Sequence, residues 1–164
     1  MIGKTIALWN PTHKRFVRMP TGLYMDKSSL RPDGTLPQGW PWEKFKVVDA
    51  GNGLIALYSA THKRFVRMPP GAYMDKSAVT DGTLPAGWAW EKFKVVDAGD
   101  GLVAFYNPTQ KQFMRMPTDE NMDKSGARPD GTLPKDWTWE VFKIVDAQPK
   151  PQGVVSLTGL RRMK

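Results

Sequence analysis

The sequence predicts an all-β protein that folds as a β-trefoil, in which three repeats of four strands surround a pseudo-threefold axis. Three observations support this prediction. A block of about 48 residues recurs three times along the chain. Each copy divides into short apolar segments separated by turns that contain glycine or proline. No segment sustains the 3.6-residue periodicity of a helix, so three copies of four strands give the twelve strands of a trefoil.

Four sequence blocks define the repeat, and they recur in the same order each time. The first is His-Lys-Arg-Phe-Val-Arg-Met-Pro, which is shortened to Phe-Met-Arg-Met-Pro in the third copy. Met-Asp-Lys-Ser, Asp-Gly-Thr-Leu-Pro and Trp-x-Trp-Glu follow it. The blocks predict a trefoil at residues 1–147, with repeats 1–50, 51–98 and 99–147, and a tail at residues 148–164. Their copies begin at His13, His62 and Phe113, at Met25, Met74 and Met122, at Asp33, Asp81 and Asp130, and at Trp40, Trp88 and Trp137.

The first repeat shows how each unit is expected to fold. Large and small apolar residues alternate over Ile6–Trp9, which predicts a strand. A second strand is expected at Arg15–Met19, and only a short third one around Tyr24–Asp26. Pro32–Gly34 has the composition of a turn, because its glycine is free to adopt a positive φ. The last strand is expected at Phe45–Asp49, and a tight glycine-containing turn leads into the next repeat.

A closed arrangement of the repeats explains their number. One unit cannot cover its own apolar face, whereas three units around an axis close a barrel and remove its edges. The main alternative is a β-propeller, whose blades have a similar length but typically number about four to eight. An open solenoid would need specialised capping repeats, and the sequence shows none.

The repeat resembles the fascin-type β-trefoil repeat. Gly53–Leu57 and Trp42–Asp49 carry this resemblance, which extends over nearly all of residues 1–147. It implies a trefoil fold; the superfamily includes actin-bundling proteins, and similar trefoils serve as lectins or as heparin-binding growth factors. It also implies that one tryptophan of each Trp-x-Trp pair lies in the core and the other near the surface. The core residues would be Trp42, Trp90 and Trp139.

The repeated tryptophans and aspartates are the candidate ligand-binding residues. An exposed indole beside acidic groups is a common way to bind a sugar, by stacking and hydrogen bonding. Two structural interpretations stay open: the tryptophans could cover the loop of their own repeat, and the aspartates could cap turns by bonding to their own backbone. The candidates are Trp40, Trp88, Trp137, Asp26, Asp75 and Asp123.

The chain has a formal net charge of +8, which favours an anionic partner if the positive charge is clustered. The basic residues of the first block are the candidate basic patch. They predict, as the alternative to a glycan-binding protein, a cytoskeletal protein that binds actin or another acidic filament. Nucleic acid ranks third, because few aromatic residues are interleaved with the basic ones. The patch comprises Lys14, Arg15, Arg18, Lys63, Arg64, Arg67, Lys111 and Arg115.

The sequence gives no indication of catalysis. His13 and His62 occupy equivalent turn positions in different repeats, where we expect them to be exposed and too far apart to share a metal ion or a proton. The chain has no cysteine, no metal-ligand spacing and no nucleotide-binding or nucleophile motif. We expect a protein that is not an enzyme and needs no cofactor or metal. The absence of cysteine, of a secretion-signal pattern at Met1–Thr5 and of a membrane-spanning stretch favours the cytoplasm.

The tail contains one strand-like segment too many. Gly153–Leu157 resembles the first strand of each repeat, and Gln148–Gln152 has the composition of a linker. Two segments therefore compete for the place beside the last strand, Phe142–Val145. We expect Ile6–Trp9 to occupy it, because Ile6 and Leu8 fill the core better. The tail would then lie outside, pair with a sheet edge, or exchange into a second molecule, giving a monomer or a strand-exchanged oligomer.

Overall fold

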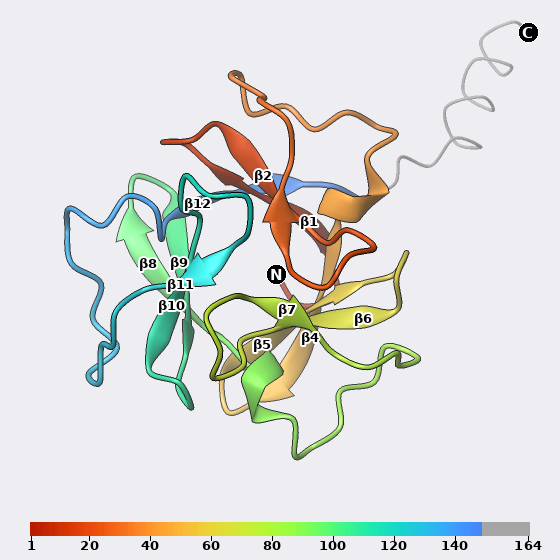
Figure 1. Cartoon of the computed structure of the whole chain (residues 1–164). Coiled ribbons are helices and arrows are strands. Elements are labelled where there is room, and N and C mark those ends of the chain that lie inside the picture. The colour runs from red at the N-terminus through yellow and green to blue at the C-terminus, as the bar shows by residue number, and fades with distance from the viewer. Residues whose placement is uncertain (149–164) are drawn as a thin grey trace, which may run out of the picture.

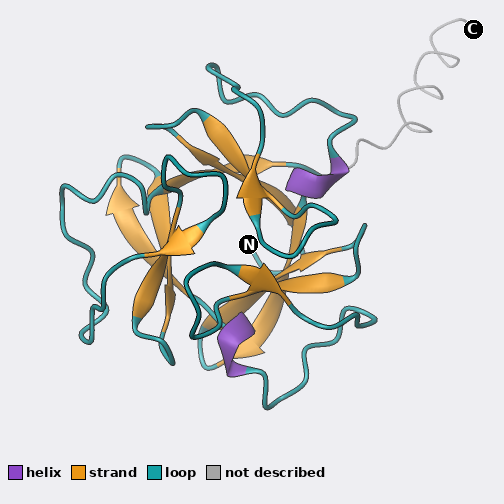
Figure 2. Cartoon of the chain, viewed as in Figure 1, coloured by secondary structure: helices purple, strands orange, loops and turns teal. Residues whose placement is uncertain are grey.

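The computed structural model describes residues 1–148 and shows three lobes around a central axis (Figure 1). Nearly all regular structure is β, and two single-turn 3₁₀ segments, η1 (Pro41–Glu43) and η2 (Ala89–Glu91), interrupt the loops (Figure 2). The tail segment Gly153–Leu157 lies outside the described residues. No helix within residues 1–148 has the length and apolar character needed to cross a membrane.

Each repeat contributes four strands, as predicted, and the twelve strands are linked in one hydrogen-bonded sheet. The third strand of each repeat has only two residues. The strands are β1 (Thr5–Asn10), β2 (Arg15–Arg18), β3 (Asp26–Lys27) and β4 (Phe45–Gly51); β5 (Leu54–Ser59), β6 (Arg64–Arg67), β7 (Asp75–Lys76) and β8 (Lys94–Gly99); and β9 (Leu102–Asn107), β10 (Gln112–Arg115), β11 (Asp123–Lys124) and β12 (Phe142–Asp146).

The repeats meet at three seams, and each seam is an antiparallel pair of strands. The pairs β4–β5 and β8–β9 are hairpins of the continuous chain, whereas β12 and β1 come from opposite ends of it. β1 pairs with β12 from Ile6 opposite Asp146 to Trp9 opposite Lys143. The N-terminal copy thus occupies the place beside the last strand that the sequence predicted for it.

The core lies around the axis and is rich in phenylalanine and methionine. Burial of this apolar surface is the main source of stability. Met25, Met74 and Met122 also join the three repeats through their backbones: each N–H donates to the carbonyl of another, at 3.0, 3.0 and 2.9 Å, in a closed ring. Fully buried members of the core include Leu8, Phe45, Leu57, Phe93, Phe105, Phe142, Met19, Met68 and Met116.

A smaller aromatic cluster lies outside the barrel in each repeat and fastens the long loop. In the first repeat, Trp9 packs on Phe16 and its indole N–H donates to the Arg31 carbonyl at 3.0 Å. Gly34 lies against the indole with φ of 72°, and a Cβ there would be 3.2 Å from the ring. The glycine of Asp-Gly-Thr-Leu-Pro is therefore required by both its backbone conformation and its close approach.

Candidate functional site

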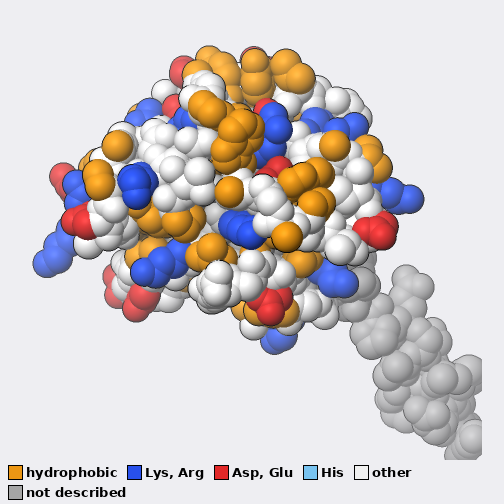
Figure 3. All heavy atoms as spheres, turned by 90° about the horizontal axis from the view of Figure 1, so that it is seen from below, with side chains coloured by type: hydrophobic (Ala, Val, Ile, Leu, Met, Phe, Trp, Pro, Cys, Tyr) orange, Lys and Arg blue, Asp and Glu red, His pale blue; other side chains and the backbone are white. Residues whose placement is uncertain are grey.

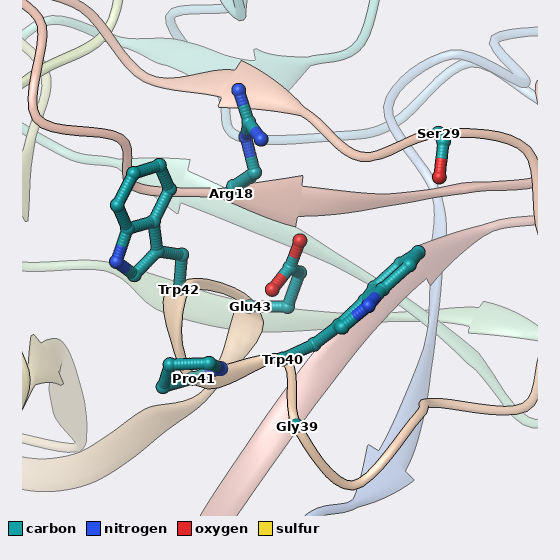
Figure 4. A pocket seen from close by; sticks show the side chains of 7 residues that line it. All are labelled: Arg18, Ser29, Gly39, Trp40, Pro41, Trp42 and Glu43. Carbon is teal, nitrogen blue, oxygen red and sulfur yellow. The ribbon is translucent and has the colours of Figure 1, made fainter.

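Each repeat contains a pocket built from its Trp-x-Trp-Glu block. The pocket of the first repeat has a volume of about 400 Å³. Trp40, Trp42 and Glu43 line it together with Arg18 from β2 and Ser29 from the loop that follows β3. The Glu43 carboxylate lies between the two indoles, on the side where Arg18 lies (Figure 4).

The other two repeats form the same pocket from equivalent residues. Its volume is about 460 Å³ in the second repeat and about 280 Å³ in the third. The structure therefore brings together tryptophans that the sequence singled out, in three copies around the axis. The linings include Arg67, Ala78, Trp88, Trp90 and Glu91 in the second repeat, and Arg115, Gly126, Trp137, Trp139 and Glu140 in the third.

The Trp-x-Trp-Glu loop is held by backbone hydrogen bonds to the strand beside it. In the first repeat, the Met19 N–H at the end of β2 donates to the Trp42 carbonyl at 2.9 Å. A neighbouring repeat adds a second restraint in two cases. The Asn107 side chain, for example, donates to the carbonyls of Ala89, Trp90 and Lys92, at 3.1–3.2 Å.

Asn10 holds the loop of the third repeat in the same way. The equivalent residue beside the loop of the first repeat is Ser59, whose hydroxyl accepts from the His62 N–H at 3.2 Å. A serine is too short to reproduce the three bonds of an asparagine, so the pockets are equivalent in lining but not in restraint.

Trp42, Trp90 and Trp139 are only half-buried, which corrects the expectation that they lie in the core. They lie instead at the boundary between repeats, where other side chains cover their rings. The Trp42 indole has the Arg18 guanidinium 5.3 Å from its ring centroid, and the His62 ring of the next repeat 5.3 Å away. Trp139 lies in the same way between Arg115 and His13, at 5.0 and 5.1 Å.

The histidines are accordingly half-buried rather than exposed turn residues, which is a second correction. The Nε2 atoms of both are buried and have no hydrogen-bond partner within the described chain. Burial lowers the pKa of His13 and of His62, because it disfavours the imidazolium, and Lys27 and Lys76 respectively act in the same direction.

Trp40, Trp88 and Trp137 are also half-buried, and they show the loop-covering role that the sequence left open. Arg31 and Arg128 lie over the rings of Trp40 and Trp137, each at 5.5 Å from the centroid. Trp88 packs against the outer cluster of Tyr58 and Phe65. Each indole thus covers its own loop and also forms a wall of the pocket.

The buried glutamates are functional candidates that the sequence analysis missed. Glu43, Glu91 and Glu140 are only 4%, 4% and 5% exposed. Burial raises the pKa of each, and the neighbouring arginine and the residue's own backbone amide oppose this effect in part. The sequence signal for these residues was the recurrence of glutamate after every Trp-x-Trp. It did not suggest burial, because glutamate is rarely buried without a partner.

The Met-Asp-Lys-Ser block joins β3 to β2 and to another repeat. Asp26 accepts two hydrogen bonds from Arg18, each of 2.9 Å. The Lys27 ammonium donates to the Pro117 carbonyl of another repeat, and the Ser28 hydroxyl accepts from the Phe16 N–H at 2.9 Å. Asp75 accepts two hydrogen bonds from Arg67 in the same way, and Asp123 accepts one from Arg115, at 3.1 Å. The aspartates thus have a structural role, and their contact with a ligand stays a prediction.

Much of the predicted basic patch is engaged within the protein. Arg18, Arg67 and Arg115 are paired with the aspartates. Arg15 and Arg64 donate to the carbonyls of Ser28 and Ser77 at 2.8 and 2.7 Å. On the face seen in Figure 3, lysine and arginine side chains are scattered among hydrophobic and acidic ones. The exposed lysines of the patch are Lys14, Lys63 and Lys111.

A further pocket of about 580 Å³ lies where the third repeat meets the first. Its lining combines His13, Arg15 and Lys27 with Asp119 and Glu120, two acidic residues that the corresponding loops of the other repeats lack. No group of three histidine, aspartate or glutamate side chains within residues 1–148 is arranged to hold a metal ion.

Comparison with known proteins supports the fold and gives no family. No protein-family model matches the sequence, and no curated protein matches it. A designed threefold-symmetric protein, ThreeFoil, superposes with a TM-score of 0.66 and 13% identity, over 87% of this chain and 98% of its own. A GlcNAcα1-4Gal-releasing endo-β-galactosidase from Clostridium perfringens gives a TM-score of 0.67 and 10% identity. That match covers 87% of this chain but only 32% of the enzyme. The chain is an all-β protein with the threefold architecture of a β-trefoil.

Proposed function

We propose that the protein is a non-catalytic, multivalent module that binds carbohydrate through its three Trp-x-Trp-Glu pockets. The observation that carries this proposal is the threefold recurrence of one pocket with two indoles and a buried carboxylate. The apolar face of a pyranose ring packs on an indole, while its hydroxyls form hydrogen bonds with carboxylate and guanidinium groups. One structural neighbour is also an endo-β-galactosidase, which agrees with this ligand class at the level of fold.

Three copies of a weak site give useful affinity. Pockets of 280–460 Å³ hold about one sugar unit, and a shallow single site of this kind binds weakly. When three sites engage one branched or clustered glycan, the second and third binding events become intramolecular and the overall affinity rises. The proposal therefore predicts strong binding to multivalent glycans and weak binding to free monosaccharides.

The alternative function is attachment to actin or another acidic filament in the cytoplasm. It is supported by the fascin-type resemblance and by the exposed lysines, Lys14, Lys63 and Lys111, at equivalent turns. This binding would weaken steeply as salt rises, because exposed charges are screened within about 8 Å at physiological ionic strength.

Two triple variants separate the functions. Trp40→Ala with Trp88→Ala and Trp137→Ala should reduce binding on a glycan array, by about tenfold for each site lost, because it removes the stacking surface. Lys14→Gln with Lys63→Gln and Lys111→Gln should leave glycan binding unchanged and should abolish co-sedimentation with actin if that activity exists. Circular dichroism and thermal melting show that each variant is folded. Normal glycan binding by the folded tryptophan variant would reject the proposed function.

A further inference from the structure

The Trp-x-Trp-Glu pockets do not share the positive charge of the whole protein. The chain carries +8, yet the only charged side chains in the lining of the first pocket are Arg18 and Glu43, and Arg18 is already paired with Asp26 outside that lining. Nε and Nη2 of Arg18 each donate a hydrogen bond of 2.9 Å to the Asp26 carboxylate, which makes the pair bidentate. The arginine thus already pairs with one carboxylate, whereas Glu43 forms no salt bridge within residues 1–148.

Glu43 presents an acceptor that the protein satisfies only in part. It is 4% exposed, forms no hydrogen bond with another residue of the described chain, and directs its carboxylate between the indoles of Trp40 and Trp42 (Figure 4). Its own backbone N–H acts on the carboxylate, which can accept further hydrogen bonds, so a ligand that supplies hydroxyl donors improves the solvation of a buried charge. The same burial raises the pKa of the Glu43 carboxyl.

An anionic sugar is disfavoured at this site by its charge, although its remaining ring hydroxyls can still donate. Its carboxylate or sulfate is an acceptor without a proton at neutral pH, and it would place a second negative charge beside Glu43 in a partly desolvated site. The same combination recurs at Glu91 with Arg67 and Asp75, and at Glu140 with Arg115 and Asp123.

We propose that the three pockets select uncharged sugars, which donate hydroxyl protons to the buried glutamates, and reject their anionic counterparts. This inference rests on the proposed carbohydrate binding and adds the charge class of the ligand. It runs against the expectation from net charge alone, which would assign a basic protein to sulfated or acidic glycans.

The test uses ligands that differ only at one carbon. Galactose and glucose, and the corresponding galacturonic and glucuronic acids, are displayed on a polymer at equal density. Their binding to the full chain is measured by biolayer interferometry at pH 7 and 150 mM salt. We expect the better neutral sugar to bind at least about tenfold more tightly than its acid, since like charges in a pocket oppose binding. A wild-type protein that prefers an acid to its neutral counterpart would overturn the inference while leaving carbohydrate binding intact.

An isosteric variant tests the cause of the selectivity. Glu43→Gln with Glu91→Gln and Glu140→Gln removes the charge and keeps the shape, so the neutral-to-acidic preference should fall to within about threefold. The control is Asp119→Asn with Glu120→Gln, exposed acids outside the three pockets, which should keep the wild-type preference. An unchanged preference in the glutamine variant would assign the selectivity to other residues and overturn the inference. Binding to none of the displayed or array glycans would reject the proposed function itself.

Discussion

His13 and His62 each lie against a tryptophan of a neighbouring repeat, and Gln110 takes their position in the third copy. Gln110 donates its side-chain amide to the Met68 carbonyl at 3.2 Å and so satisfies its buried end without a titrating group. The chain thus contains its own comparison between an ionisable and a neutral side chain at equivalent sites.

We predict that the histidines make the fold sensitive to mild acid. Their pKa values are lowered in the folded state from the ordinary value of 6.5, so the unfolded chain takes up protons first as pH falls. Folding stability is then unaffected well above pH 6.5 and declines as pH falls through and below that value. His13→Gln with His62→Gln should reduce the decline in the urea midpoint between pH 7.5 and 5. Gln110→His should increase it, and parallel curves for all three proteins would contradict the prediction.

The sequence identified most of the candidate residues, but it did not show which groups surround them. Recurrence identified the Trp-x-Trp-Glu block, but it could not show that both indoles line one pocket or that the glutamate is buried between them. The role of Asp26 was hidden for a related reason. Its partner Arg18 is eight residues away, and the two side chains meet only because β2 and β3 pair in the register Arg18 opposite Asp26.

At the scale of the element, the hairpin of β2 and β3 depends on one serine. Ser28 is 2% exposed, and its hydroxyl accepts from the Phe16 N–H and donates to the Ser29 carbonyl. Ser77 and Ser125 make the same bonds in the other repeats. The hydroxyl takes the place of a continued ladder where the strand is too short to provide one.

Ser28→Ala should therefore destabilise the protein by about 1–3 kcal/mol, because it leaves the buried Phe16 N–H without an acceptor. The matched control is Ser29→Ala, at the exposed neighbouring position, which should change the free energy of unfolding by less than about 0.5 kcal/mol. Chemical denaturation measures both values. Equal effects of the two substitutions would show that the hydroxyl of Ser28 does not support the hairpin.

The positions of the strands were predicted well where apolar alternation is long, and poorly where it is short. β1 and β4 extend the expected segments by one or two residues at their ends. β3 is displaced from Tyr24–Asp26 to Asp26–Lys27, since pairing with β2 fixes it rather than its own pattern. The turn η1 at Pro41–Glu43 has no signal of its own beyond the proline, and it decides where Trp42 and Glu43 point.

At the scale of the whole molecule, the seam between β12 and β1 closes the barrel. β1 contributes Ile6 and Leu8, which are 3% and 0% exposed, to the core. The Ala147 N–H also donates to the Thr5 carbonyl at 3.0 Å, just beyond the paired positions. The described chain therefore holds both strands that closure requires.

Removing residues 149–164 should accordingly leave the free energy of unfolding within about 0.5 kcal/mol of its original value. Removing residues 1–9 should prevent folding or cost several kcal/mol, because it takes two large side chains from the core and opens the sheet. Thermal melting and size-exclusion chromatography of the two truncated proteins provide the comparison. Folding of the second but not the first would mean that the tail closes the barrel.

The seam between β12 and β1, which no turn connects, pairs its strands in the same register as the hairpin seam between β4 and β5. Ile144 and Val145 lie opposite Leu8 and Ala7, just as Val47 and Val48 lie opposite Leu57 and Ala56 in the first hairpin. The chain break therefore lies at one of three interchangeable seams. A circular permutant that joins Asp146 to Thr5 through Ala-Gly-Asn-Gly, and begins instead at Asn52, keeps every strand pairing. The strand pairings therefore define a circular order of strands, and the position of the two termini in that order does not change the pairings.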